Sequence, residues 1–159
     1  MTFELESPAF HHNDSIPMRY TGDGAEVSPP LAWHGVPAEA QSLALIVEDP
    51  DAPDPAAPRQ AFVHWLVYNL PGGEGELPEG VTAAALPQGA AEGINDAHGV
   101  GYAAPLPAIG RHRYFFRLYA LAAPLAVEDT PLNRASLERA MSGLVLAQTE
   151  LVGLYQRPE

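Results

Sequence analysis

Residues 42–53 read SLALIVEDPDAP, and residues 61–70 read AFVHWLVYNL. Both stretches contain a short apolar run rich in β-branched and aromatic residues, which is typical of buried strands. The link between them is stiff from Asp49 to Pro53, because proline fixes its own φ and drives the preceding residue toward extended backbone. We therefore predict strands over 42–47 and 61–70, joined through a rigid acidic corner.

The two carboxylates of this corner, Asp49 and Asp51, have two interpretations. Asp side chains often cap turns by accepting backbone hydrogen bonds, which would make both residues structural. Held in a rigid loop near a strand that carries His64, they can also belong to a binding or catalytic site. His64 is equally open, because a histidine in an apolar strand is often a buried residue with a satisfied hydrogen bond.

The composition describes an acidic domain without cysteine. At 159 residues the chain can form one domain, residues 1–159, with a continuous core. The absence of cysteine excludes disulfides, thiol nucleophiles and thiolate metal sites. A net charge of −12 argues against nucleic acid as a partner and against adsorption to an anionic bilayer, but a small anion in a shielded pocket is compatible with it.

The N-terminal residues, MTFELESPAF, show no basic stretch followed by an apolar one. No run approaches the roughly 20 apolar residues of a membrane span. We therefore expect a cytoplasmic protein without an integral membrane segment. The neighbouring pair His11 and His12 is expected in a turn, since no third metal ligand is apparent near it.

Periodicity and turn residues predict the other β elements. Short strands are expected at 2–5 and 16–20, and an extended segment at 28–33 places Trp33 in the core. Residues 71–101, rich in Gly, Ala and Pro, predict a long folded loop region with one short strand; such loops are usually either disordered or part of a site.

Two strands carry the polar residues of interest. Strand 61–70 is apolar on both faces and is expected to be central, with Phe62, His64, Leu66 and Tyr68 on one face and Val63, Trp65 and Val67 on the other. The aromatic stretch HRYFFRLYAL, residues 112–121, predicts another strand. Alternation along this strand places His112, Tyr114, Phe116 and Leu118 on one face. The other face carries Arg113, Phe115, Arg117 and Tyr119.

One long helix is predicted from Arg134 to Tyr155, with Asn133 as its N-cap. Its packing face recurs every three or four residues, at Leu137, Met141, Leu144, Gln148, Leu151 and Tyr155. Gly143 inside a helix costs about 1 kcal/mol relative to Ala, so we expect another backbone to approach it closely.

Six polar residues stand in largely apolar surroundings: Asp49, Asp51, His64, His112, Arg113 and Tyr114. Such a set can bind a metal, perform acid–base chemistry or hold an oxyanion. Asp-x-Asp with two scattered histidines is a poor match to a metal site, and we predict no metal or other cofactor. No Gly-x-Ser-x-Gly motif is present for nucleophilic catalysis. A carboxylate repels a bound anion unless a proton lies between them, so affinity for a phosphate-like ligand should fall as pH rises.

These residues resemble the phosphatidylethanolamine-binding proteins, specifically their bacterial Raf-kinase-inhibitor-like branch. The first matching block is Asp49-Pro50-Asp51-Ala52-Pro53 with Phe62 to Pro71, and the second runs from Gly101-Tyr102 through Pro105, Pro107 and Gly110 to His112-Arg113-Tyr114. Smaller agreements occur at 28–33, 93–96 and 140–143. Order and spacing hold from Tyr20 to Tyr155, which makes the resemblance specific.

The resemblance implies a mainly β fold, in which a large antiparallel sheet packs on a smaller sheet and a C-terminal α-helix lies against it. It also implies a pocket for phosphate, acetate or a phospholipid head group. The residues it assigns to the ligand are Asp49, Pro53, His64, Ala104, Pro105, His112 and Tyr114. Asp51 and Arg113 are supporting residues, and we expect them to form an ion pair that locks the two blocks together.

Three positions depart from the family pattern. The family often has Gly at the position of Ala104 and Pro at that of Ala108, so the loop should approach an anion less tightly here. It often has His at the position of Leu144, so we expect a less polar pocket on the side of the helix.

The function implied is a non-catalytic protein that binds a small anion or a phosphate-bearing ligand and modulates a protein partner such as a kinase or protease. Bacterial relatives suggest a homodimer. The alternative is a small hydrolase or lyase, with Asp49 and His64 as base and acid and Tyr114 stabilising charge.

Overall fold

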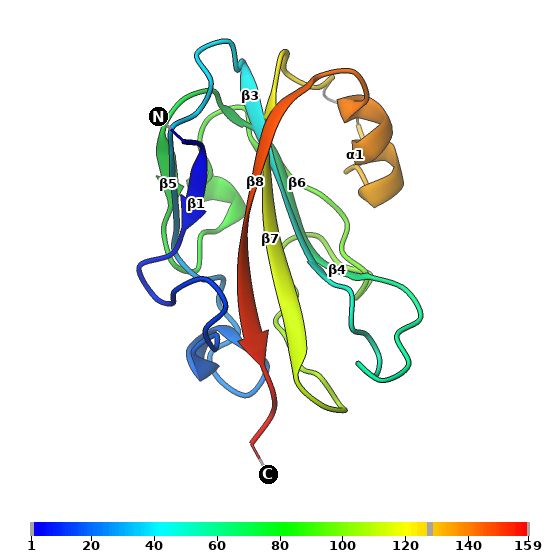
Figure 1. The fold of residues 1–159 in the computed structure, drawn as a ribbon. Helices are drawn as coiled ribbons and strands as arrows, with labels where there is room; N and C mark the ends of the chain where they lie inside the picture. Colours follow the sequence, from blue (N-terminus) through cyan, green and yellow to red (C-terminus); the bar gives the residue numbers. More distant parts are fainter. Residues whose placement is uncertain (1, 127–128, 159) are drawn as a thin grey trace.

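Two antiparallel sheets form the body of the molecule in the computed structural model, which describes residues 2–126 and 129–158 (Figure 1). The large sheet has the order β6-β4-β3-β7-β8, and the small sheet has the order β1-β2-β5. The strands of the large sheet are β3 (Ser42–Asp49), β4 (Phe62–Pro71), β6 (Ala91–Glu92), β7 (His112–Leu121) and β8 (Val145–Tyr155). Those of the small sheet are β1 (Glu4–Glu6), β2 (Leu31–His34) and β5 (Gly75–Leu77). The predicted two-sheet architecture is confirmed.

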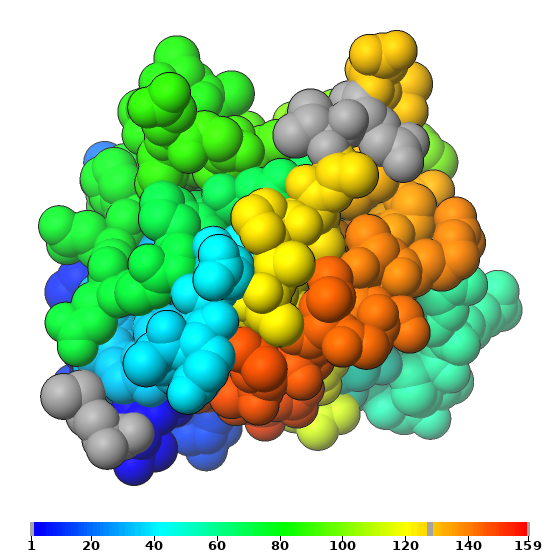
Figure 2. All heavy atoms as spheres, turned by 90° about the horizontal axis from the view of Figure 1, so that it is seen from above, coloured from blue at the N-terminus to red at the C-terminus, as the bar shows by residue number. Residues whose placement is uncertain are grey.

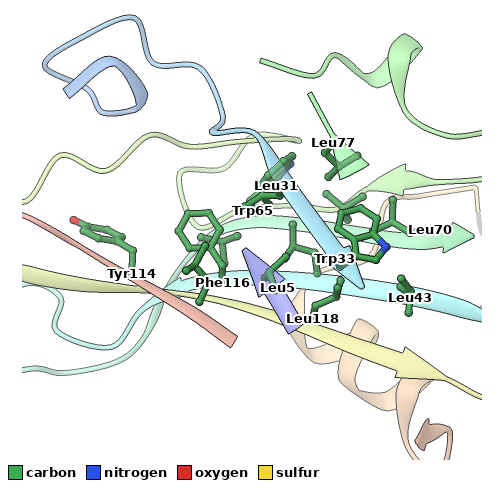
Figure 3. Close-up of a cluster of buried hydrophobic side chains, with 14 of the residues drawn as sticks. Leu5, Leu31, Trp33, Leu43, Trp65, Leu70, Leu77, Tyr114, Phe116 and Leu118 are labelled. Carbon is green, nitrogen blue, oxygen red and sulfur yellow. The ribbon is translucent and has the colours of Figure 1, made fainter. Parts of the chain in front are cut away.

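The main core lies between the two sheets (Figure 3). Leu5, Leu31, Trp33 and Leu77 from the small sheet meet Leu43, Trp65, Phe116 and Leu118 from the large one. Trp33 is buried in this cluster, as the sequence predicted. Fully burying one such large apolar side chain is worth roughly 1.5–3 kcal/mol, so this layer fixes how the sheets stack.

A second cluster covers the opposite face of the large sheet. Helix α1 (Arg134–Met141) contributes Leu137 and Met141, which pack with Ala44 and Ile46 of β3 and Leu66 of β4. The buried carboxylate of Glu48 in β3 forms ion pairs with Arg117 and Arg134. These contacts hold α1 against the sheet, so β3 is covered on both faces and all eight of its residues are buried.

The long helix predicted over 134–155 is wrong in its second half. Asn133 caps α1 as predicted, accepting from the Ser136 N–H at 2.9 Å, but the helix ends at Met141 and the chain continues as β8. Gly143 has a φ of +80° and open space where a Cβ would stand, so it serves a turn and no backbone approaches it. The period of two in this strand was mistaken for a helical period of three or four: Ala147, Leu151 and Tyr155 of β8 lie an even number of residues apart and face the main core.

The predicted faces of strand 61–70 are also partly wrong, because β4 contains a bulge. Glu48 pairs with Val63, and the residue before it in β3, Val47, pairs with Trp65. His64 therefore has no partner in the β3 register. A bulge shifts the alternation by one residue. His64 and Trp65 therefore both lie on the side of the small sheet, whereas Leu66 and Tyr68 join the second cluster. The central position of β4, between β6 and β3, is confirmed.

Other segments differ less from expectation. The strand predicted at 16–20 is wrong: the 3₁₀ helix η1 (Met18–Tyr20) follows a single bridge between Ser15 and Leu154. The predicted strand at 2–5 is present as β1, shifted by one or two residues. The 71–101 region contains two short strands, β5 and β6, and the 3₁₀ helix η2 (Ala83–Ala85). The faces predicted for 112–121 are confirmed in β7.

The two ends of the large sheet differ. At the end seen in Figure 2, the start of β3, the segment after β7 and the start of β8 lie side by side. Backbone hydrogen bonds close this end, from Gln41 N–H to Leu121 O and from Ala122 N–H to Leu144 O, both 2.8 Å. The opposite end, at the bottom of Figure 1, holds the longer loops and the candidate site.

Candidate functional site

The site forms where β3 ends and where β4 and β7 begin. Because β3 is antiparallel to both neighbours, the end of β3 and the starts of β4 and β7 lie at the same end of the sheet. A cavity of about 300 Å³ opens there. Six of the seven predicted ligand residues line it, namely Asp49, Pro53, His64, Ala104, His112 and Tyr114. The residues were predicted as a set from two sequence blocks, and the fold brings them together.

Asp49 and His112 form a buried pair at the pocket. The Nδ1 of His112 lies 2.5 Å from Asp49 Oδ2, and both side chains are almost fully buried. Asp49 Oδ1 accepts the Asp51 N–H at 2.7 Å, so this carboxylate also closes the acidic corner as a turn cap. Asp49 therefore combines the two roles that the sequence left open: turn cap and pocket residue.

The hydrogen bonds of His112 show how many protons this pair holds. His112 Nε2 lies 2.7 Å from the Ile109 carbonyl oxygen, which can only accept, so Nε2 must carry a proton. If Nδ1 and the carboxylate were both unprotonated, two lone pairs would face each other at 2.5 Å. One proton must therefore lie between Asp49 and His112, and the pair as a whole is neutral.

His64 is oriented by the loop that forms the far wall of the pocket. Its Nδ1 donates to the Ala103 carbonyl oxygen at 2.7 Å, which leaves Nε2 as the free ring nitrogen. Burial lowers the pKa of His64 from its ordinary value of 6.5, so the ring is neutral near pH 7 and Nε2 is an acceptor. The ring centroids of His64 and Tyr114 are 5.3 Å apart in an edge-on arrangement.

Tyr114 brings a hydroxyl to the same cavity. Burial raises the pKa of this hydroxyl, so it stays protonated. Neither the Tyr114 hydroxyl nor His64 Nε2 has a hydrogen-bond partner among the described residues, and no side-chain nitrogen or oxygen there is both unpaired and shut off from solvent. Both groups therefore open into the cavity, one as a donor and the other as an acceptor.

Pro105 is not among the lining residues. Its side chain is buried, and its carbonyl oxygen accepts the Gly22 N–H at 2.8 Å. The neighbouring Tyr102 hydroxyl donates to the Tyr20 carbonyl oxygen at 2.8 Å. Together these bonds fasten the pocket wall to the segment around η1, so Pro105 positions the loop and Ala104 faces the cavity.

The predicted Asp51–Arg113 pair is present. The guanidinium donates from Nε at 3.0 Å and from Nη2 at 2.9 Å, and the Arg113 backbone N–H adds a third bond to Asp51 at 2.9 Å. These bonds lower the pKa of the Asp51 carboxyl below its ordinary value of 3.8. The pair joins the acidic corner to β7 and turns both charges away from the cavity.

Comparison with known proteins agrees with this geometry. A family model described as phosphatidylethanolamine-binding protein matches residues 6–156. The chain belongs to the phosphatidylethanolamine-binding protein family. A relative from Methanothermobacter thermautotrophicus, named UPF0098 protein, is 47% identical over 154 residues that cover 96% of this chain and 98% of the relative.

Two solved structures share the fold of this phosphatidylethanolamine-binding protein family member along its whole length. CT736 of Chlamydia trachomatis, described as a homologue of the family, aligns with a TM-score of 0.90 at 39% identity and covers 99% of both chains. Escherichia coli YbcL, described as a member of the mammalian family, aligns with a TM-score of 0.87 at 27% identity and covers 99% of this chain and 100% of its own.

Among the three departures from the family pattern, Ala104 and Ala108 line the pocket. Leu144 does not. It lies between α1 and β8, packs against the second cluster and accepts the Ala122 N–H at 2.8 Å. The expectation that Leu144 makes the pocket less polar is wrong, because the predicted helix that was to carry it there ends at Met141.

The sequence missed the apolar part of the lining. Phe62, Leu106 and Pro107 line the cavity together with Ala52, Ala97 and Ala103. Phe62 precedes His64 by two residues and its ring lies tilted against the His64 ring, with the centroids 4.8 Å apart, so strand alternation could have found it. Leu106 and Pro107 lie within the glycine-bounded stretch 101–110, which was assigned to the site without separating the residues that face the cavity.

Two further findings concern the described residues only. Within 2–126 and 129–158, no group of three or more histidine, aspartate or glutamate side chains is arranged to hold a metal ion. None of the helices described in these ranges is long and apolar enough to cross a membrane.

Proposed function

We propose that this protein binds a small anion or a phosphate-bearing ligand in the cavity beside Asp49, His64 and Tyr114. The observation that supports the proposal is the pair of open polar groups, the Tyr114 hydroxyl and His64 Nε2, in a cavity with mainly apolar walls. Ligand sites commonly combine apolar walls with a few convergent polar groups of this kind. The neutral Asp49–His112 pair beside them removes the repulsion that an isolated carboxylate would exert on an anion.

We propose binding rather than catalysis as the activity. The described lining residues include no serine, threonine or lysine that could act as a nucleophile. His112, the histidine paired with a carboxylate, has both ring nitrogens engaged and offers none to a substrate. A hydrolase or lyase would instead depend on His64 Nε2, so turnover of a phosphate ester by highly purified protein that disappears in His64→Ala would favour the enzyme.

The test is a titration of the full chain with inorganic phosphate, followed through backbone amide chemical shifts. We expect saturable changes at residues of the pocket wall such as Ala103 and Ala104, and weaker binding in Tyr114→Phe. Tyr119→Phe is the matched control, since Tyr119 packs against the second cluster on the opposite face of the sheet. Absence of saturable shifts in wild type, or equal affinity of the two variants, would contradict the proposal.

Modulation of a partner enzyme and a homodimeric state are proposals that come from the family resemblance, and a cytoplasmic location is a proposal that comes from the sequence pattern. Sedimentation of the purified chain tests the dimer, and cell fractionation tests the location. Kinase and protease inhibition assays with wild type and Tyr114→Phe would show whether any such effect depends on the pocket.

A further inference from the structure

Two groups of opposite hydrogen-bonding character face the pocket. His64 Nε2 is an acceptor, because Nδ1 donates to the Ala103 carbonyl oxygen at 2.7 Å and burial lowers the pKa of the ring, which favours its neutral form. The Tyr114 hydroxyl is a donor. An occupant that satisfies both must accept one hydrogen bond and donate another. An acceptor left without a donor in such a buried site weakens binding substantially.

The pocket also offers no compensating cation. The sequence contains no lysine, and the described lining residues include no arginine. Arg113, which stands between two pocket residues in β7, is bonded to Asp51. Since the Asp49–His112 pair is neutral, a doubly charged anion would enter this cavity without a positive partner.

The remaining titratable groups around His64 and Tyr114 are also committed. Asp96, in the loop after β6, accepts the Val63 N–H at 2.7 Å. Tyr102 donates to the Tyr20 carbonyl oxygen, and burial raises its pKa. Of the titratable side chains described here, His64 and Tyr114 are the two whose polar atoms are left free to contact an occupant of the cavity.

From this arrangement we infer that the pocket selects acids that bind while still carrying a proton, such as the monoanion of a phosphate monoester, over phosphodiesters. The inference rests on the proposed function and narrows its ligand class. The P–OH of a monoester monoanion donates to His64 Nε2, while one of its unprotonated oxygens accepts from Tyr114. A diester has the same single charge but no P–OH, so His64 Nε2 is left unpaired.

Ethyl phosphate and dimethyl phosphate provide a matched pair of probes. The two are isomers, and at pH 5 both are monoanions, so they differ mainly in the hydroxyl on phosphorus. We expect ethyl phosphate to bind the full chain at least about tenfold more tightly than dimethyl phosphate at pH 5. At pH 8 its monoanion is scarce, because the second pKa of a phosphate monoester is about 6, and its affinity should fall about tenfold or more.

Each outcome of this comparison has a distinct meaning. Equal affinity of the two isomers at pH 5, or tighter binding of dimethyl phosphate, would overturn the inference and leave the proposed function standing. An affinity for ethyl phosphate that is the same at pH 5 and pH 8 would do the same. If neither isomer nor inorganic phosphate binds, the proposed function fails and the inference fails with it.

Two variants separate the roles of the two groups. His64→Phe keeps an aromatic ring but removes the acceptor, so the ratio of the two affinities should approach one. Tyr114→Phe removes the donor to both probes, so both affinities should fall while their ratio is retained. A ratio unchanged in a folded His64→Phe variant would refute the assignment of the acceptor. If that variant fails to fold, the isomer comparison on wild type still decides the inference.

Discussion

Replacing Asp49 by Leu or by Asn separates hydrogen bonding from charge at the buried Asp49–His112 pair. Leu has the same branched shape, with two methyl groups in place of the two oxygens, but no acceptor, so the Asp51 N–H and the His112 Nδ1 lose their partners. Asn can keep both bonds. Its carbonyl oxygen accepts the Asp51 N–H, and its NH₂ donates to Nδ1 of a neutral His112 that carries its proton on Nε2.

The magnitude follows from the two bonds and their burial. The contacts are 2.7 Å from the Asp51 N–H and 2.5 Å from His112, and both are buried. Each polar group left unpaired in such a site costs about 1–3 kcal/mol. We therefore expect Asp49→Leu to be about 3 kcal/mol less stable than Asp49→Asn. For a domain of this size, that difference lowers the Tm by about 6–12 °C.

Urea unfolding followed by tryptophan fluorescence measures this difference, because Trp33 and Trp65 are both buried in the main core. Equal m-values in the two variants are required for the comparison. Free energies of unfolding that agree within about 1 kcal/mol would refute the proposed proton arrangement, since they would mean that Asn cannot replace both bonds.

Arg113→Leu removes two side-chain bonds to Asp51 but leaves the backbone bond, so we expect a loss of about 1–2 kcal/mol by urea unfolding; an unchanged Tm would show that the pair does not lock β7 to the acidic corner. Burial lowers the pKa of His64 in the folded protein below 6.5. As pH falls below about 6.5, His64 is therefore protonated in the unfolded chain before it is protonated in the folded one, and the free energy of unfolding decreases. The free energy of unfolding of His64→Gln should therefore vary less with pH than that of wild type between pH 7 and pH 5, and identical slopes would contradict this. Gly143→Ala should lower the stability by about 1 kcal/mol, because φ is +80° and only glycine adopts such a value without strain. Gly143→Asn should cost less, because Asn tolerates the left-handed region better than Ala and the space is open. A lower Tm for the Asn variant than for the Ala variant would contradict the role of Gly143 in the turn.

The sequence was informative where residues in regular strands alternate and where motifs fall in rigid loops. Strand β7 was predicted with both of its faces, because buried residues alternate with less buried ones from His112 to Ala120. Residues of the pocket were identified through two sequence blocks, and antiparallel pairing of β3 with β4 and β7 explains why those blocks meet. A single sequence could not show which atoms of those residues face the cavity.

The errors arose where one residue changes the period. Between α1 and β8, Gly143 has a positive φ and belongs to the turn that follows the helix, whereas the prediction treated it as a small residue in a continuous helix. The apolar residues beyond it fit both a period of two and a period close to 3.6, so pattern alone could not decide. In β4, the bulge at His64 has no signature in the residue types around it.

That bulge connects the fold to the site. His64 lies outside the β3 register, and its backbone carbonyl oxygen accepts the Ala103 N–H at 2.8 Å instead. Its ring donates back to the Ala103 carbonyl oxygen at 2.7 Å, so one residue holds the pocket wall through two bonds and still presents Nε2 to the cavity. The same shift turns Trp65 into the main core, where it is fully buried. Bulges next to functional sites redirect side chains in this way. Regular pairing in β4 would place His64 and Trp65 on opposite faces, so the bulge is what lets a buried core residue and a free ring nitrogen stand side by side.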